Sequence, residues 1–300
     1  MPLPRPWAIL AMCLVVVTIL FGTPADYPPA LHAAIVALAL VVGVALTWLA
    51  GAHVVVRGDA DDTARLRAAS AGLLVAPFVL FGLVPGVGPP RNQPPQDNEL
   101  RFLLLAIDPM LVGAGLLPKE ALAGAGERLL ASVGLAAIVL ATPLYVAFAL
   151  IQRVGYVAVE LHWTWAATVS GNLHELTELD AFSMAALFFA GALTYVATAA
   201  FAGSLARVGW LGRGTATLLQ LASGLGLAFL LARGFAYPSL TAAFSHWYTV
   251  PGFVAGIPAV PWMPLCVMGV LLLRRAGREW RETAAALSAP GRRAAPSMPT

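Results

Sequence analysis

The chain has 300 residues, of which 59% are hydrophobic and only 11% are charged, with a formal net charge of +3. Soluble proteins carry roughly 25% charged residues, so this chain has too few charges to cover a water-facing surface of its size. The composition therefore excludes a soluble enzyme, a nucleic-acid-binding domain and a disordered chain. It predicts a polytopic membrane protein.

About 20 mostly apolar residues are needed to cross a bilayer core about 30 Å thick. The sequence contains about eight such segments, and none shows the alternating pattern of a membrane-spanning strand. We therefore predict an all-α bundle of transmembrane helices at residues 7–23, 31–56, 69–87, 100–117, 129–151, 180–205, 212–232 and 252–273. The bundle forms a single domain over residues 1–288, and a disordered cytoplasmic tail follows at 289–300.

The distribution of positive charge predicts the orientation of the bundle. With the N-terminus inside, 14 of the 18 lysines and arginines lie in inner segments. This agrees with the positive-inside rule and predicts that both termini are cytoplasmic, in a bacterial-type inner (plasma) membrane. Residues 7–23 are alternatively a cleaved signal peptide, which would leave the sidedness of the other spans unchanged.

Four of the five histidines are predicted to lie at or near the outer face of the membrane. Imidazole nitrogen binds haem iron, copper and zinc, so histidines gathered at one depth predict a cofactor or metal site. The candidate ligands are His32, His162, His174 and His246. For His162 and His246, which lie beside tryptophans, an interfacial belt at the lipid headgroups is the alternative interpretation.

The two outer arginines Arg153 and Arg233 can hold the propionates of a haem, or instead contact lipid headgroups. The sequence has no C-x-x-C-H motif, so any haem would be a non-covalent b-type haem. A copper or zinc ion is the alternative cofactor.

An acidic segment at residues 171–180 contains the third of these histidines, His174. His174 and Glu178 are four residues apart, so in a helix they lie on one face and can coordinate one metal ion or pass a proton. The structural alternative is a capped helix N-terminus, where acidic side chains stabilise the helix dipole.

Asp108 is the candidate catalytic or proton-handling residue because it falls inside a predicted span. A carboxylate at the centre of a span costs roughly 2.5–3.5 kcal/mol, so such residues are usually functional. Pro109 follows it directly, so the alternative is that Asp108 begins a helix with Pro109 in its first turn.

Other polar and small residues within the spans have simpler interpretations. Thr194, Tyr195, Thr198 and Gln220 are predicted to hydrogen-bond between helices, and a proton path through them to Asp108 is the alternative. The small residues Ala222, Gly224 and Gly226 are predicted to let their helix approach a neighbour closely. The charged run at 274–282 is predicted to extend the last helix toward anionic headgroups.

The region from residue 31 to residue 86 resembles the early part of subunit I of cytochrome bd-type quinol oxidases. The residues that carry the resemblance are Leu31, His32 and Gly43, then Arg57, Gly58, Asp59, Arg65 and Leu66 of the loop, and then Val84, Pro85 and Gly86. In that family a histidine near the outer start of a span ligates haem, and the resemblance implies this role for His32. The chain lacks the family's glutamate pair in the next span and its long quinol-binding loop. What the resemblance implies for this chain is a haem or quinone environment in the membrane.

Three hypotheses for function follow from the sequence. The first is a haem- or metal-binding redox or electron-transfer subunit with its site on the outer side, in contact with lipids and other membrane or redox subunits. The second is a proton- or solute-coupled transporter that uses Asp108. The third is a non-catalytic membrane subunit or assembly factor of a larger complex.

Overall fold

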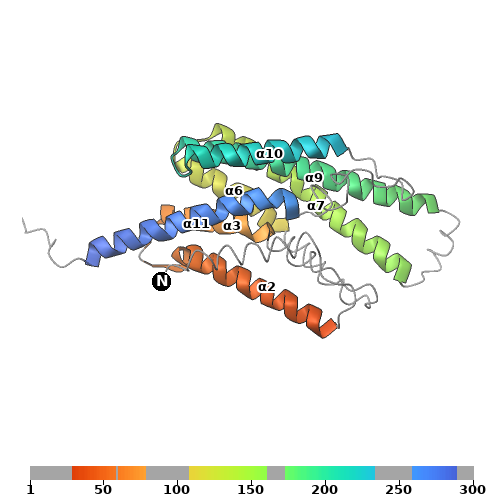
Figure 1. The fold of residues 1–300 in the computed structure, drawn as a ribbon, viewed down its shortest axis with the longest axis horizontal. Coiled ribbons are helices and arrows are strands. Elements are labelled where there is room, and N and C mark those ends of the chain that lie inside the picture. The colour runs from red at the N-terminus through yellow and green to blue at the C-terminus, as the bar shows by residue number, and fades with distance from the viewer. Residues whose placement is uncertain (1–28, 59, 79–107, 161–172, 234–258, 289–300) are drawn as a thin grey trace, which may run out of the picture.

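The computed structural model describes residues 29–58, 60–78, 108–160, 173–233 and 259–288. Within these ranges the chain is helical and contains no strand, as the sequence predicted. The elements, shown in Figure 1, are α2 (Pro29–Ala50), the 3-10 helix η1 (Ala52–Val56), α3 (Asp62–Phe78), α6 (Asp108–Gly124), α7 (Leu129–Glu160), α9 (Leu173–Arg207), α10 (Arg213–Arg233) and α11 (Ala259–Ser288).

Three of the described helices contain a segment long and apolar enough to cross a membrane. These segments are Leu129–Phe148 in α7, Ala185–Arg207 in α9 and Arg213–Leu231 in α10. They correspond to the predicted spans at 129–151, 180–205 and 212–232. Four further predicted spans, 31–56, 69–87, 100–117 and 252–273, overlap α2 with η1, α3, α6 and α11, while 7–23 lies outside the described residues.

The helices pack as a ring around one apolar core. α7 lies between α9 and α6, α3 lies between α6 and α11, and α11 returns to contact α9. α10 packs on the outside of α9, and α2 packs against α11. Large, fully buried side chains come from helices all around the ring and include Leu74, Leu111, Leu122, Ile138, Tyr145, Leu187, Phe201, Trp262, Leu265 and Met268.

The second predicted span is not one continuous helix. α2 ends at Ala50, Gly51 adopts a φ of 148°, and the chain continues as η1. The backbone of Gly51 lies directly against α11, where a Cβ atom on it would come within 2.1 Å of the carbonyl oxygen of Leu273. Glycine is the residue that accepts both the positive φ and this close contact.

The ends of several helices differ from the predicted spans because helices continue beyond the apolar segment. α3 begins at Asp62, seven residues before the predicted span, and the Asp61 carboxylate caps it by accepting a hydrogen bond from the Ala64 amide at 2.5 Å. α11 continues to Ser288, as predicted for the charged run at 274–282. Apolar content therefore locates the spans but not the helix ends.

The small residues of α10 do not act as a set. A Cβ atom on Gly226 would meet the Tyr195 ring of α9 at 2.5 Å, so this glycine does permit close packing. A Cβ atom on Gly224 would meet nothing within 4 Å, and Ala222 is exposed. Among the described contacts, the prediction therefore holds for Gly226 and does not hold for Gly224 and Ala222.

Candidate functional site

The predicted outer site falls on helix ends and on segments beyond the described residues. His32 lies in the first turn of α2, and His174 and Glu178 lie in the first two turns of α9. Arg153 lies in the last third of α7, and Arg233 is the last residue of α10. For these residues the structure describes the backbone only, and His162 and His246 lie outside the described residues.

The helix ends that carry these candidates lie toward the same end of the bundle. Figure 1 shows α2 and α9 beginning, and α7 and α10 ending, toward the right-hand side of the view. α2 packs against α11 and η1, whereas α9 packs against α7 and α10 on the other side of the ring. The described backbone therefore brings the candidates to one end, and it does not bring the starts of α2 and α9 side by side.

His174 and Glu178 share one continuous helix. α9 runs without a break from Leu173 to Arg207, so the two positions are separated by about one helical turn. This is the spacing that allows two side chains to act on one ligand. Among the residues whose side chains are described, no group of three or more His, Cys, Asp or Glu could hold a metal ion.

Asp108 is the first residue of α6, and Pro109 follows in the first turn. Proline fits this position because a first-turn amide has no partner within the helix. This agrees with the alternative interpretation, in which the aspartate begins a helix. The side chain of Asp108 lies outside the described part of the structure, as do the residues that precede it.

The buried hydroxyl groups join helices to one another. Tyr145 of α7 and Thr194 of α9 lie 2.9 Å apart through their hydroxyl oxygens, and both are buried. Thr198 donates to the carbonyl of Thr194 at 2.9 Å, within its own helix. Where α10 packs against α9, Gln220 of α10 donates to the Ala199 carbonyl at 3.3 Å. The Tyr145–Thr194 and Gln220–Ala199 contacts support the predicted role of polar groups in joining helices, whereas the bond of Thr198 stays within α9.

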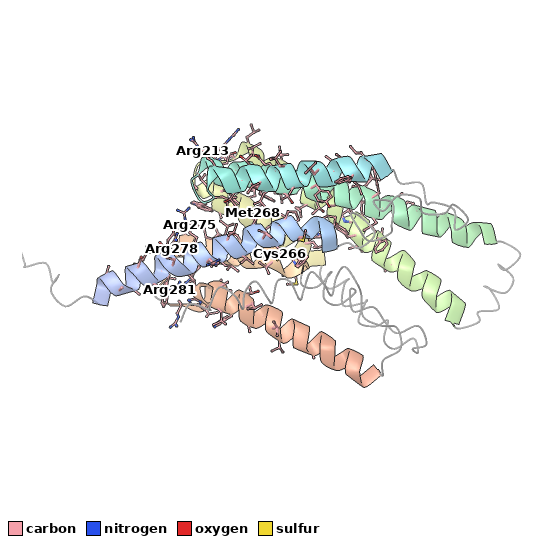
Figure 2. The ribbon with its side chains drawn as sticks, in the orientation of Figure 1. Arg213, Cys266, Met268, Arg275, Arg278 and Arg281 are labelled. Atoms are coloured by element: carbon pink, nitrogen blue, oxygen red, sulfur yellow. The ribbon has the colours of Figure 1, made fainter. Side chains whose placement is uncertain are left out.

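The opposite end of the bundle holds a cluster of charged side chains, called here the arginine-rich end. Figure 2 shows Arg213, Arg275, Arg278 and Arg281 toward this left-hand side. The segments gathered here come from four parts of the sequence: the loop before α3, the turn between α6 and α7, the turn between α9 and α10, and the second half of α11. The sequence predicted all four to lie on the same side of the membrane.

Specific contacts join these segments. Arg67 of α3 donates to Glu279 of α11, with 3.2 Å between Nη1 and Oε2. Arg275 donates to the other oxygen of Glu279 at 2.6 Å and to the carbonyl of Gly209. Arg207 at the end of α9 reaches Glu127 beside α7, with 3.3 Å between Nη1 and Oε2. The arginine-rich end is therefore a connected network and not a set of separate surface charges.

The turn after α9 positions an aromatic ring in this network. Gly209, with a φ of 69°, follows the helix, and the amide of Trp210 bonds back to the carbonyl of Leu205 at 2.9 Å. This is a Schellman ending, which needs a left-handed residue at the position that Gly209 occupies. The Trp210 ring then lies under the Arg67 guanidinium, 5.0 Å from its central carbon, as a cation–π contact.

A pocket lies beside this network, between α3, α6, α9 and α11. Its rim carries Arg67, Ser70, Arg275, Glu279 and Trp210. Its walls are apolar and consist of Leu74, Pro118, Ala121, Leu122, Phe201, Leu205, Leu272 and Ala276. The pocket is a small hollow in which these charged groups lie beside tightly packed apolar side chains.

Sequence reasoning did not single out this pocket. The sequence assigns the run at 274–282 to lipid headgroups as a whole, although Arg275 and Glu279 have the i,i+4 spacing of an ion pair within one helix. That spacing was the only available signal, because the partners on α3 and in the turn after α9 are remote in sequence. No protein-family model, curated protein or solved structure matches this chain.

Proposed function

We propose that the protein is a multi-pass membrane protein that binds a haem or a metal ion at the end opposite the arginine-rich end and serves as a redox or electron-transfer subunit. The observation that carries the proposal is the spacing of His174 and Glu178 in one unbroken helix. The helix ends that carry His32, Arg153 and Arg233 lie toward the same end of the bundle.

Two ligands are too few for a stable metal site, so the proposal requires at least one further ligand. His162 and His246 are the candidates for this role, and both belong to the same predicted face of the membrane. For a b-type haem, His174 and one of these histidines would bind the iron, and Arg153 or Arg233 would pair with a propionate. The resemblance to the haem-ligating region of quinol oxidases adds His32 as an alternative axial ligand.

The test is spectroscopic and uses the full-length protein purified in mild detergent. We expect a Soret band that shifts on reduction, or copper or zinc bound in about one equivalent per chain. His174→Ala and Glu178→Ala should remove or weaken this signal. His53→Ala is the matched control, because His53 lies at the arginine-rich end, where its Nδ1 is 3.0 Å from the Trp48 carbonyl oxygen. A wild-type protein with neither a Soret band nor bound metal would overturn the proposal.

We also propose about eight spans, with both termini cytoplasmic, in a bacterial-type inner membrane. The contacts among Arg67, Glu279 and the turn at Gly209 support the grouping of these segments on one face, and the positive-inside rule assigns that face to the cytoplasm. Cysteine labelling tests it. A cysteine introduced at Ala125, which is exposed in the turn between α6 and α7, should be protected from an impermeant reagent in intact cells, and one at Asn92 should react.

A further inference from the structure

We propose that the pocket at the arginine-rich end binds the phosphate of an anionic phospholipid at Arg67 and Arg275, while the acyl chains of the lipid stay in the bilayer. This site is separate from the proposed haem or metal site, which lies toward the other end of the bundle. The proposal rests on three features of the pocket: its level relative to the predicted membrane, its charge and an unsatisfied hydrogen-bond donor.

The pocket lies where two of its helices change from charged to apolar. In α3, Arg65 and Arg67 are followed by the apolar residues of the second half of the helix. In α11, the apolar first half ends at Leu273 and the arginines begin at Arg274. Arg67 and Arg275 meet at Glu279, so the two transitions lie at one level. That is the level of the lipid headgroups if the apolar halves lie in the membrane.

The charge of the rim favours an anion. Among the lining residues, Arg67 and Arg275 together exceed the single negative charge of Glu279. The guanidinium group binds phosphate oxygens through two parallel N–H groups, so arginine suits this ligand better than lysine. A zwitterionic lipid lacks the net charge that this surface attracts.

Arg67 has a donor left over for such a ligand. Its Nη1 group bonds to Glu279 and its guanidinium lies over Trp210, but its Nε atom is buried and has no hydrogen-bond partner among the described residues. A buried donor without a partner costs about 1–3 kcal/mol, which an incoming phosphate oxygen would recover.

The experiment is native mass spectrometry of the full-length protein in detergent, titrated with dihexanoyl phosphatidylglycerol, dihexanoyl phosphatidylcholine or inorganic phosphate. We expect one phosphatidylglycerol to be retained in preference to phosphatidylcholine, and no competition from millimolar phosphate. Arg67→Gln should weaken the retained binding by about tenfold, as the loss of one charge-assisted contact predicts. Arg281→Gln removes the same charge from an exposed position on α11 and should bind as the wild type does.

A second variant tests the pocket itself and leaves every charge in place. Ala276 lines the pocket and is half-buried, so Ala276→Leu should narrow it and weaken phosphatidylglycerol binding while the thermal midpoint stays within a few degrees. Equal loss in Arg67→Gln and Arg281→Gln would show nonspecific surface attraction and overturn the proposal. Unchanged binding in Arg67→Gln and Ala276→Leu would do the same, and displacement by inorganic phosphate would show that a soluble anion is recognised instead.

Discussion

Arg67 and Glu279 lie 212 positions apart in the sequence and form an ion pair that joins α3 to α11. The Arg67 side chain is 27% exposed and that of Glu279 is 37% exposed, so the pair lies between the protein surface and the core. Glu279 also accepts a hydrogen bond from Arg275 on its own helix. One carboxylate therefore holds two arginines at the mouth of the pocket, and one of them crosses to another helix.

The first prediction concerns the energy of this ion pair. A double-mutant cycle with Arg67→Gln and Glu279→Gln should give a coupling free energy of about 1 kcal/mol, measured by unfolding in mixed detergent micelles. High salt should reduce the coupling because the pair is partly exposed. The control cycle uses Arg278 and Glu282, which lie 4.0 Å apart and are 66% and 70% exposed. That cycle should give no measurable coupling, and equal values in the two cycles would contradict the interpretation.

The second prediction concerns the break between α2 and η1. Gly51→Ala should destabilise the protein by about 3 kcal/mol or more, because the new Cβ combines an unfavourable φ with a clash against the Leu273 carbonyl. The clash is with backbone, so no side-chain movement can relieve it. Thermal unfolding of the purified protein measures the effect.

Gly58→Ala is the matched control for this change. Gly58 is exposed in the loop before α3, and a Cβ atom there would meet nothing within 4 Å. It should therefore leave the thermal midpoint nearly unchanged. If Gly51→Ala were equally neutral, α2 and α11 would not approach as closely as described.

Apolar segments in the sequence were sufficient to predict the helical class and the three helices that can cross a membrane, at 129–148, 185–207 and 213–231. Positive charge predicted which segments share a face, and the contacts of Arg67 and Arg207 join those segments. Hydropathy and positive charge are each added over many neighbouring residues, so one atypical residue does not change the prediction. They are weak at helix ends, where capping by Asp61 and the close contact at Gly51 decide the boundary.

The pocket could not be predicted in the same way. Its rim needs Arg67, Trp210 and Glu279 to meet, and their meeting depends on the packing of α3 against α11 and on the turn after α9. A single sequence contains no direct signal for such long-range contacts. The candidates His174 and Glu178 rest on a local spacing, and the structure places both in one helix. A further ligand would come from another segment of the chain, so it stays a prediction.

The third prediction concerns the hydrogen bond between α7 and α9. Thr194 has one hydroxyl hydrogen, which it donates to the Ala190 carbonyl at 2.8 Å, so Tyr145 is the donor in the bond between the two helices. Tyr145→Phe removes that bond and leaves the Thr194 bond intact. We expect a loss of about 1 kcal/mol in the free energy of unfolding, measured in mixed micelles.

The control for the tyrosine is Thr217→Val in α10. Thr217 is exposed and its hydroxyl donates to Arg213 within the same helix, so its loss should cost only a few tenths of a kcal/mol. A Tyr145→Phe variant as stable as the wild type would show that the hydroxyl contact adds nothing to helix association. A proton path through these hydroxyls would instead require changed proton transport in the same variant.

The fourth prediction compares two glycines that are two residues apart in α10. Alanine is favoured over glycine inside a helix by about 1 kcal/mol, so Gly224→Ala should leave stability unchanged or raise it, since nothing lies within 4 Å of the new methyl group. Gly226→Ala gains the same propensity but drives a methyl group against the Tyr195 ring at 2.5 Å. That ring is only 4% exposed, so it has little room to move, and we expect a net loss of about 1–2 kcal/mol. The two variants should therefore shift the unfolding midpoint in opposite directions or by clearly different amounts. Identical behaviour would mean that α10 packs on α9 through another face, and it would remove the reason for glycine at position 226.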